Sequence, residues 1–82
     1  MRQPLRAYSV GVRLKQAREE SGLSRRALAT ASTVGESTIA HIESGNKQPR
    51  GDTVELLALA LKVDLCWLAY GIGKPHKADK PD

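Results

Sequence analysis

The sequence predicts an all-α fold, a bundle of five short helices. Apolar residues make up 40% of the chain, and they recur at the spacing of helix faces. Serine, aspartate and glycine stand between the apolar segments, where helices begin and end. The 82 residues are enough for one small domain and too few for two.

The first helix is predicted over residues 9–21, with Ser9 as its N-cap and residues 1–8 as an N-terminal arm. Gly22 ends this helix. Apolar residues at positions i, i+4 and i+7 form the face that we expect to be buried, namely Val10, Leu14 and Ala17.

A second, short helix follows, with Ser24 as its N-cap and with Leu28 and Ala29 facing inward. Arg25 and Arg26 lie in its first turn, where cations oppose the helix macrodipole. Because folding does not require cations at this position, we expect an external anion to bind there.

Residues 31–35 are expected to interrupt the helix, because poor helix formers precede a glycine. A third helix is predicted from Glu36 to about Ser44, with Ile39 and Ile42 facing inward. A polar loop follows it. The outer face of the third helix carries small or polar side chains, namely Ser37, Thr38, His41 and Ser44.

The fourth helix is predicted over residues 53–61, with Asp52 as the N-cap of a capping box. This segment is apolar nearly all round, so we expect it to be the central helix of the bundle. Asp64 caps a last short helix, which Gly71 closes.

The folded domain is therefore expected over residues 9–71, with a disordered, flexible tail over residues 72–82. The formal net charge of +4 is unevenly distributed. Residues 1–51 hold nine bases and four acids, an excess of +5, whereas residues 52–71 carry −2. A polyanion is a plausible partner for the basic part of the chain.

Two short helices joined by a tight turn, the second with small polar side chains outward, are typical of a helix-turn-helix. The second helix of such a unit enters the major groove of DNA, which is about 12 Å wide. Short segments over residues 10–71 also follow the sequence pattern of one family of helix-turn-helix proteins. They are Leu14-Lys15, Arg18-Glu19, Gly22-Leu23-Ser24, Leu28-Ala29, Ser37-Thr38-Ile39, Ile42-Glu43-Ser44-Gly45, Pro49, Leu56 to Leu61, Trp67-Leu68 and Gly71. In this order and spacing, the chain resembles the Cro/repressor-type helix-turn-helix family of phage and bacterial transcription regulators.

The residue types and the resemblance together assign roles to individual side chains. Arg25 holds the position from which this family clamps a phosphate and supports the recognition helix. The resemblance also implies a structural ion pair between Arg18 and Glu43. Bases are expected to contact Glu36, Ser37, Thr38 and His41, and phosphates to contact Ser24, Arg25, Ser44, Lys47 and Arg50.

The chain departs from the family pattern at three positions. Thr33 replaces the usual turn glycine, and a β-branched residue disfavours positive φ, so we expect the turn to take another conformation. Gly35 replaces the usual serine N-cap of the third helix. Glu36 either accepts a hydrogen bond from cytosine N4 or only complements the helix dipole.

Several other side chains have a structural alternative to a functional role. We favour groove contact or plain exposure for His41 over metal binding, because no second ligand lies at metal-binding spacing. Trp67 is expected in the core, although Trp67 or Tyr70 could form a symmetric dimer contact. Cys66 is expected to be an inert, partly buried thiol.

The sequence as a whole predicts a cytoplasmic, sequence-specific regulator of transcription, a repressor that binds double-stranded DNA as a homodimer on a two-fold operator. We expect no enzyme activity, no metal, no cofactor, no small-molecule ligand and no membrane span. The alternative is a protein-interaction module, such as an antitoxin or an anti-repressor partner, in which DNA binding is secondary.

Overall fold

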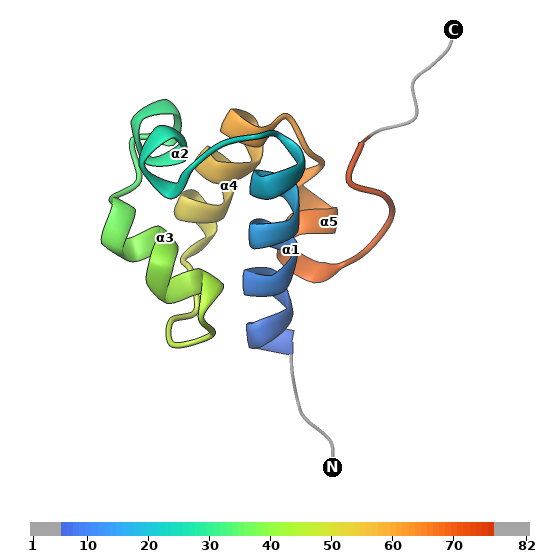
Figure 1. Ribbon diagram of the computed structural model, residues 1–82. Helices are drawn as coiled ribbons and strands as arrows, with labels where there is room; N and C mark the ends of the chain where they lie inside the picture. Colours follow the sequence, from blue (N-terminus) through green and yellow to red (C-terminus); the bar gives the residue numbers. More distant parts are fainter. Residues whose placement is uncertain (1–5, 77–82) are drawn as a thin grey trace, which may run out of the picture.

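The protein is all-helical over residues 6–76, which are the residues that the computed structural model describes. Five helices follow one another without a strand in this part of the chain, which confirms the predicted fold class. The helices are α1 (Arg6–Glu20), α2 (Arg25–Ser32), α3 (Glu36–Glu43), α4 (Gly51–Leu61) and α5 (Leu65–Tyr70) (Figure 1).

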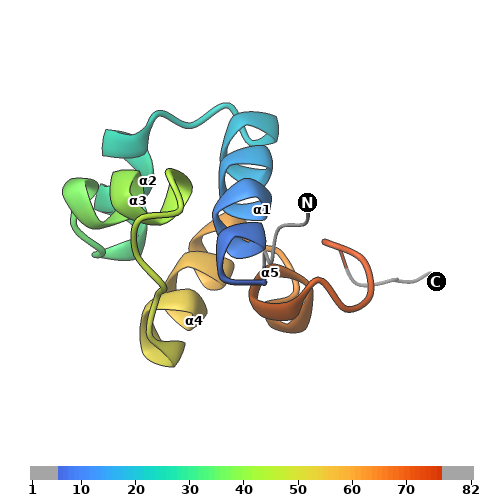
Figure 2. The same ribbon diagram turned by 90° about the horizontal axis from the view of Figure 1, so that it is seen from below.

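Each helix packs mainly against two others. Helix α1 lies against α3 and α5, α2 lies against α3 and α4, and α4 lies against α5. The five helices thus form a closed ring, in which α3 and α5 are on opposite sides of α1 (Figures 1 and 2). This arrangement leaves one long side of α3 open to solvent.

The interior of the ring is a single apolar core. Six of the seven residues predicted to face inward on the first three helices are buried, namely Val10, Leu14, Ala17, Leu28, Ile39 and Ile42. The seventh, Ala29 of α2, is half-buried and packs against the core. The remaining core residues come from the turn before α3 and from the last two helices, namely Val34, Val54, Leu57, Ala58, Leu61, Trp67 and Leu68.

The prediction that α4 is the central helix is wrong. Its only main neighbours are α2 and α5, and two of its leucines remain in solvent, with Leu56 41% and Leu59 75% exposed. A helix that is apolar on every side needs neighbours on every side, and this ring gives α4 no more neighbours than any other helix.

Two predicted helix starts are wrong by two or three residues. Helix α1 begins at Arg6, so Ser9 lies inside it and is not its N-cap. Helix α4 begins at Gly51 with Arg50 at the N-cap, so Asp52 lies in the first turn, where a carboxylate favours the helix dipole. Residues 6–8 of the predicted arm are therefore helical, and residues 1–5 lie outside the described residues.

The predicted side-chain caps of α2 and α5 are confirmed. The Ser24 hydroxyl accepts a hydrogen bond of 3.0 Å from the amide of Ala27 at the start of α2. The Asp64 carboxylate accepts one of 3.0 Å from the amide of Trp67 at the start of α5. Local capping chemistry thus determined both of these starts.

The turn between α2 and α3 does not avoid positive φ, contrary to the expectation from Thr33. This residue has φ of 63°, the left-handed conformation that the glycine of the family pattern would adopt easily. Its amide donates to Ala29 O at 2.9 Å, and the hydroxyl of buried Ser32 accepts from the amide of Val34 at 3.2 Å. Burial of Val34 and these bonds hold the turn, so the tertiary structure overrides the preference of threonine.

The segment after α5 belongs to the tail that is predicted to be flexible from residue 72. The amide of Asp64 donates to Pro75 O at 2.7 Å, which holds the segment 72–76 against the turn before α5. This hydrogen bond is a contact between the predicted tail and the folded domain. Residues 77–82 lie outside the described residues.

Three neighbouring side chains of α5 have contrasting environments. Trp67 is 8% exposed and belongs to the core, so it is not a surface on which a second copy could dock. Tyr70 is 73% exposed. Cys66 is exposed as well, so the prediction of a partly buried thiol is wrong, because Trp67 and Leu68 take the inward face of this short helix.

Candidate nucleic-acid interface

Helix α3 presents a polar face at the surface. Glu36, Ser37 and His41 are exposed, as expected for side chains that reach a groove. Thr38 differs from these three because it is half-buried. A Cβ added at Gly35 would lie 3.6 Å from Thr38 Oγ1, so this hydroxyl lies close to the start of the helix.

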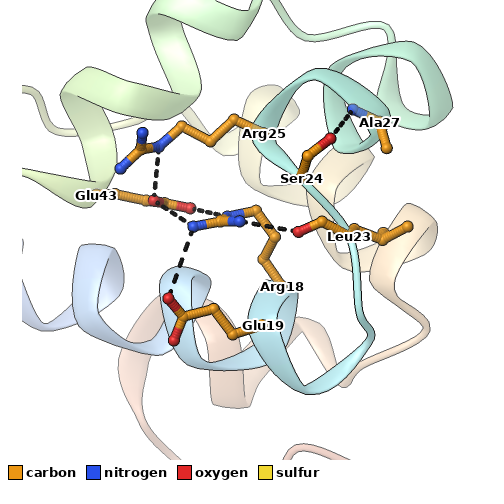
Figure 3. Close-up of polar contacts among 7 residues, drawn as sticks. All are labelled: Arg18, Glu19, Leu23, Ser24, Arg25, Ala27 and Glu43. Carbon is orange, nitrogen blue, oxygen red and sulfur yellow. Dashed lines mark hydrogen bonds and ion pairs between the residues drawn. The ribbon is translucent and has the colours of Figure 1, made fainter.

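The C-terminal end of α3 is held by a buried carboxylate. The Glu43 side chain is 2% exposed and lies between two arginines from different helices (Figure 3). From α1, Arg18 donates to both of its oxygens, through Nε to Oε2 at 2.7 Å and through Nη2 to Oε1 at 3.2 Å. From α2, Arg25 Nε donates to Oε1 at 3.0 Å. One carboxylate therefore joins three helices.

Arg18 is the buried partner in this cluster. Its side chain is 10% exposed, and it also donates through Nη1 to Leu23 O at 2.8 Å, in the loop between α1 and α2. The hydrogen bond with Glu43 raises the pKa of Arg18 above its usual value. A cation whose pKa is raised by folding stabilises the fold at every pH below its unfolded-state pKa, which for arginine lies far above neutral pH, and loses that contribution only above its folded-state pKa. The Arg18 side of the ion pair therefore does not titrate in the physiological range.

Arg25 has a partner within the fold, contrary to the expectation that only an external anion explains a cation at this position. Glu43 offsets the unfavourable interaction of this guanidinium with the dipole of α2. The side chain is nevertheless 44% exposed, and Figure 3 shows that Arg25 contacts Glu43 through Nε, with no contact drawn from its two terminal nitrogens. Arg25 is thus both a structural ion-pair partner and a cation at the surface.

The other predicted phosphate ligands lie at the surface near helix ends. Ser24 is the N-cap of α2, Ser44 follows the last residue of α3, and Lys47 is in the loop after it. The contact between Arg25 and Glu43 brings the start of α2 next to the end of α3, so Ser24 and Ser44 lie at the same end of α3. Arg50 is 82% exposed and pairs with Asp52 at 3.6 Å.

A glycine in α1 sets the distance between α1 and α3, and sequence reasoning missed it. A Cβ added at Gly11 would lie 2.2 Å from Ile42 O, so only glycine fits between the two backbones. An isolated glycine inside a helical pattern is the signal that could have found it, since it often marks close packing.

A second missed contact connects α1 with α5. Arg13 Nε donates to Leu68 O at 3.0 Å across 55 residues of sequence. Burial lowers the pKa of Arg13 from its usual value. This arginine contributes to the positive charge of the first 51 residues, but it holds the fold together and lies on the side of α1 that faces away from α3.

Comparison with known proteins identifies the family. A family model described as helix-turn-helix, of the Cro/repressor type, matches residues 14–68, from the middle of α1 to α5. The chain belongs to this family. No curated protein and no solved structure matches the chain significantly. As a member of the Cro/repressor-type helix-turn-helix family, the protein is a DNA-binding regulator of transcription, in which α2 and α3 are the two helices of the motif.

Over residues 6–76, no helix is both long enough and apolar enough to cross a membrane. The same residues contain no group of three or more histidine, cysteine, aspartate or glutamate side chains that could hold a metal ion.

Proposed function

We propose that the protein is a sequence-specific repressor that binds a two-fold DNA operator as a homodimer. The observation that carries this proposal is the exposed face of α3, where Glu36, Ser37 and His41 project from a helix whose far end is anchored by Glu43. Side chains on a rigid, anchored helix can reach base edges in a reproducible register. Half-buried Thr38 lies at the edge of this face.

The backbone of the DNA is held by the surface around α3. Arg25, Lys47 and Arg50 supply cations, and the Ser24 and Ser44 hydroxyls lie at the ends of α2 and α3. Contacts to phosphates position the protein on the duplex without reading its sequence. The excess of +5 over residues 1–51, against −2 over residues 52–71, places the positive charge on the part of the chain that contains α3.

Dimer formation is proposed because one such domain covers one half-site. The recognition helices of a dimer then meet successive major grooves about 34–36 Å apart. Exposed apolar side chains at the end of α5, Tyr70 and Ile72, lie away from α3 and are candidates for the contact between two copies.

The experiment is a titration of duplex DNA at several salt concentrations, with Arg25→Ala and the charge-matched control Lys74→Ala. Loss of one phosphate contact by Arg25→Ala lowers the slope of log K against log salt by about 0.9, on specific and random duplexes alike. Lys74 is exposed beyond α5, so its substitution leaves the slope unchanged. Footprinting on a selected site then shows two half-sites about one helical turn apart.

Two results contradict the proposal. Absence of duplex binding by the wild-type chain at low salt removes the DNA-binding role and favours a protein-interaction module. If Arg25→Ala changes only the preferred DNA sequence and leaves the salt slope unchanged, Arg25 does not contact a phosphate.

A further inference from the structure

Glu36, the first residue of α3, differs from the other glutamates near the candidate interface. Its side chain is exposed, and over residues 6–76 its carboxylate has no hydrogen bond or ion pair. By contrast, Glu19 and Glu43 pair with Arg18, and Glu20 accepts a hydrogen bond from Gln16. Within the described residues, folding therefore supplies no polar partner for the Glu36 carboxylate.

Capping of the helix does not explain this residue either. The N-cap of α3 is Gly35, which offers no side-chain bond, and no amide at the start of α3 donates to the Glu36 carboxylate. The attraction of the carboxylate to the dipole of α3 remains, but that attraction stabilises the helix equally on every DNA sequence and off DNA.

A carboxylate in the major groove has strict requirements. It is repelled by the phosphates on both sides, and it accepts hydrogen bonds but donates none. Cytosine presents only the N4 amine at this edge, whereas guanine presents two acceptors and thymine presents an acceptor and a methyl group. Adenine presents an amine beside the acceptor N7. In the base pair, the cytosine amine has one neighbouring acceptor, guanine O6, whereas the adenine amine lies between two, its own N7 and thymine O4. Cytosine is therefore the base that satisfies a carboxylate with the fewest acceptors beside it.

We propose that Glu36 selects cytosine at one position of each half-site, both by accepting from its N4 amine and by rejecting bases that present acceptors. This inference rests on the proposed function, because it requires α3 to lie in the major groove. Ser37 and His41 are four residues apart and so share one row of the helix surface, whereas Glu36 lies on the neighbouring row and meets a different base. Its effect is thus confined to a single base pair of the half-site.

The test is a selection from random duplexes with four proteins: the wild type, Glu36→Gln, Glu36→Ala and the control Glu55→Gln. Glu55→Gln removes the same charge from an exposed position on α4, outside the motif. The wild type and the control enrich cytosine at one position of each half-site. Glu36→Gln enriches adenine there, because an amide pairs with N6 and N7 of adenine, and Glu36→Ala enriches no base at that position.

A second measurement uses the wild-type protein on its selected site. Replacing that cytosine by thymine weakens binding about tenfold or more, whereas the same replacement leaves binding by Glu36→Ala nearly unchanged. The inference is overturned if Glu36→Gln keeps the base preference of the wild type at every position. If the wild type selects no site and binds no duplex at low salt, the proposed function fails instead, so the two failures are distinguishable.

Discussion

The two ends of α3 are built in opposite ways. At the C-terminal end, the buried carboxylate of Glu43 takes three hydrogen bonds from Arg18 and Arg25, and the backbone at Ile42 touches α1 at Gly11. At the N-terminal end, Gly35 provides no side-chain cap, and the exposed carboxylate of Glu36 has no partner within residues 6–76.

This difference separates two tasks on one short helix. Polar contacts within the fold fix the direction and depth of α3 at its last turn, on the side where phosphates are expected. The first turn keeps its polar groups available for another molecule. An eight-residue helix can do both, because its backbone hydrogen bonds make it rigid over that length.

The largest expected effect comes from breaking the anchored end with Glu43→Ala. This change leaves Arg18 buried without its counter-charge, which costs about 3–5 kcal/mol of unfolding free energy. Small domains have only about 5–15 kcal/mol in total, so the variant is expected to be largely unfolded when warmed. Urea unfolding followed by circular dichroism measures the loss.

Glu19→Ala is the matched control for this experiment. Glu19 is 59% exposed and lies 4.0 Å from the same arginine, so its removal costs about 1 kcal/mol or less. Equal losses of unfolding free energy in the two variants would show that the carboxylate of Glu43 stabilises the fold no more than that of Glu19.

A smaller effect is expected from Gly11→Ala, which separates α1 from the anchored end of α3. The added methyl group meets Ile42 O, a backbone atom that can move only with its helix. Overpacking of this kind costs about 1–3 kcal/mol, although alanine is the better helix former. Thermal unfolding measures the change.

Gly51→Ala tests whether the effect of Gly11 comes from crowding. Nothing lies within 4 Å of a Cβ at Gly51, so stability should stay unchanged or rise by up to about 1 kcal/mol. Should Gly11→Ala also leave stability unchanged, the close contact between α1 and α3 does not exist in solution.

The smallest expected effect on stability comes from Thr33→Gly, in the turn that leads into the N-terminal end of α3. Glycine removes the cost of positive φ but is more flexible in the unfolded chain, so a net gain of about 0.5–1 kcal/mol is expected. The midpoint of urea unfolding measures it. Thr30→Gly, at an exposed position inside α2, is expected to lose about 1 kcal/mol instead. A loss in both variants would mean that Thr33 is not strained.

Much of the helical fold could be predicted because its signals are local. Apolar spacing identified the buried faces of α1 and α3, and the hydroxyl of Ser24 and the carboxylate of Asp64 marked the starts of α2 and α5. The predicted start of α4 was wrong. Asp52 matches the cap pattern, but the helix already begins at Gly51, with Arg50 at its N-cap.

The candidate site was predictable only in part. The exposed side chains of α3 follow from its periodicity, and the pair of Arg18 and Glu43 followed from the family resemblance. The third member of the cluster did not follow from either source. Arg25 and Glu43 are 18 residues apart in sequence, and the residue pattern of α2 or α3 does not predict that the start of α2 meets the end of α3.

The sequence by itself determined that there are five helical segments in residues 6–76, which faces α1, α2 and α3 bury and which family motif they form, because each of these properties depends on residues within a few turns of one another. The tertiary structure decided the left-handed turn at Thr33, the exposure of Leu59 on α4 and the partner of Arg25. These features depend on which surfaces meet in space. A backbone conformation or an ion pair that is unfavourable locally persists when contacts from distant residues offset its cost.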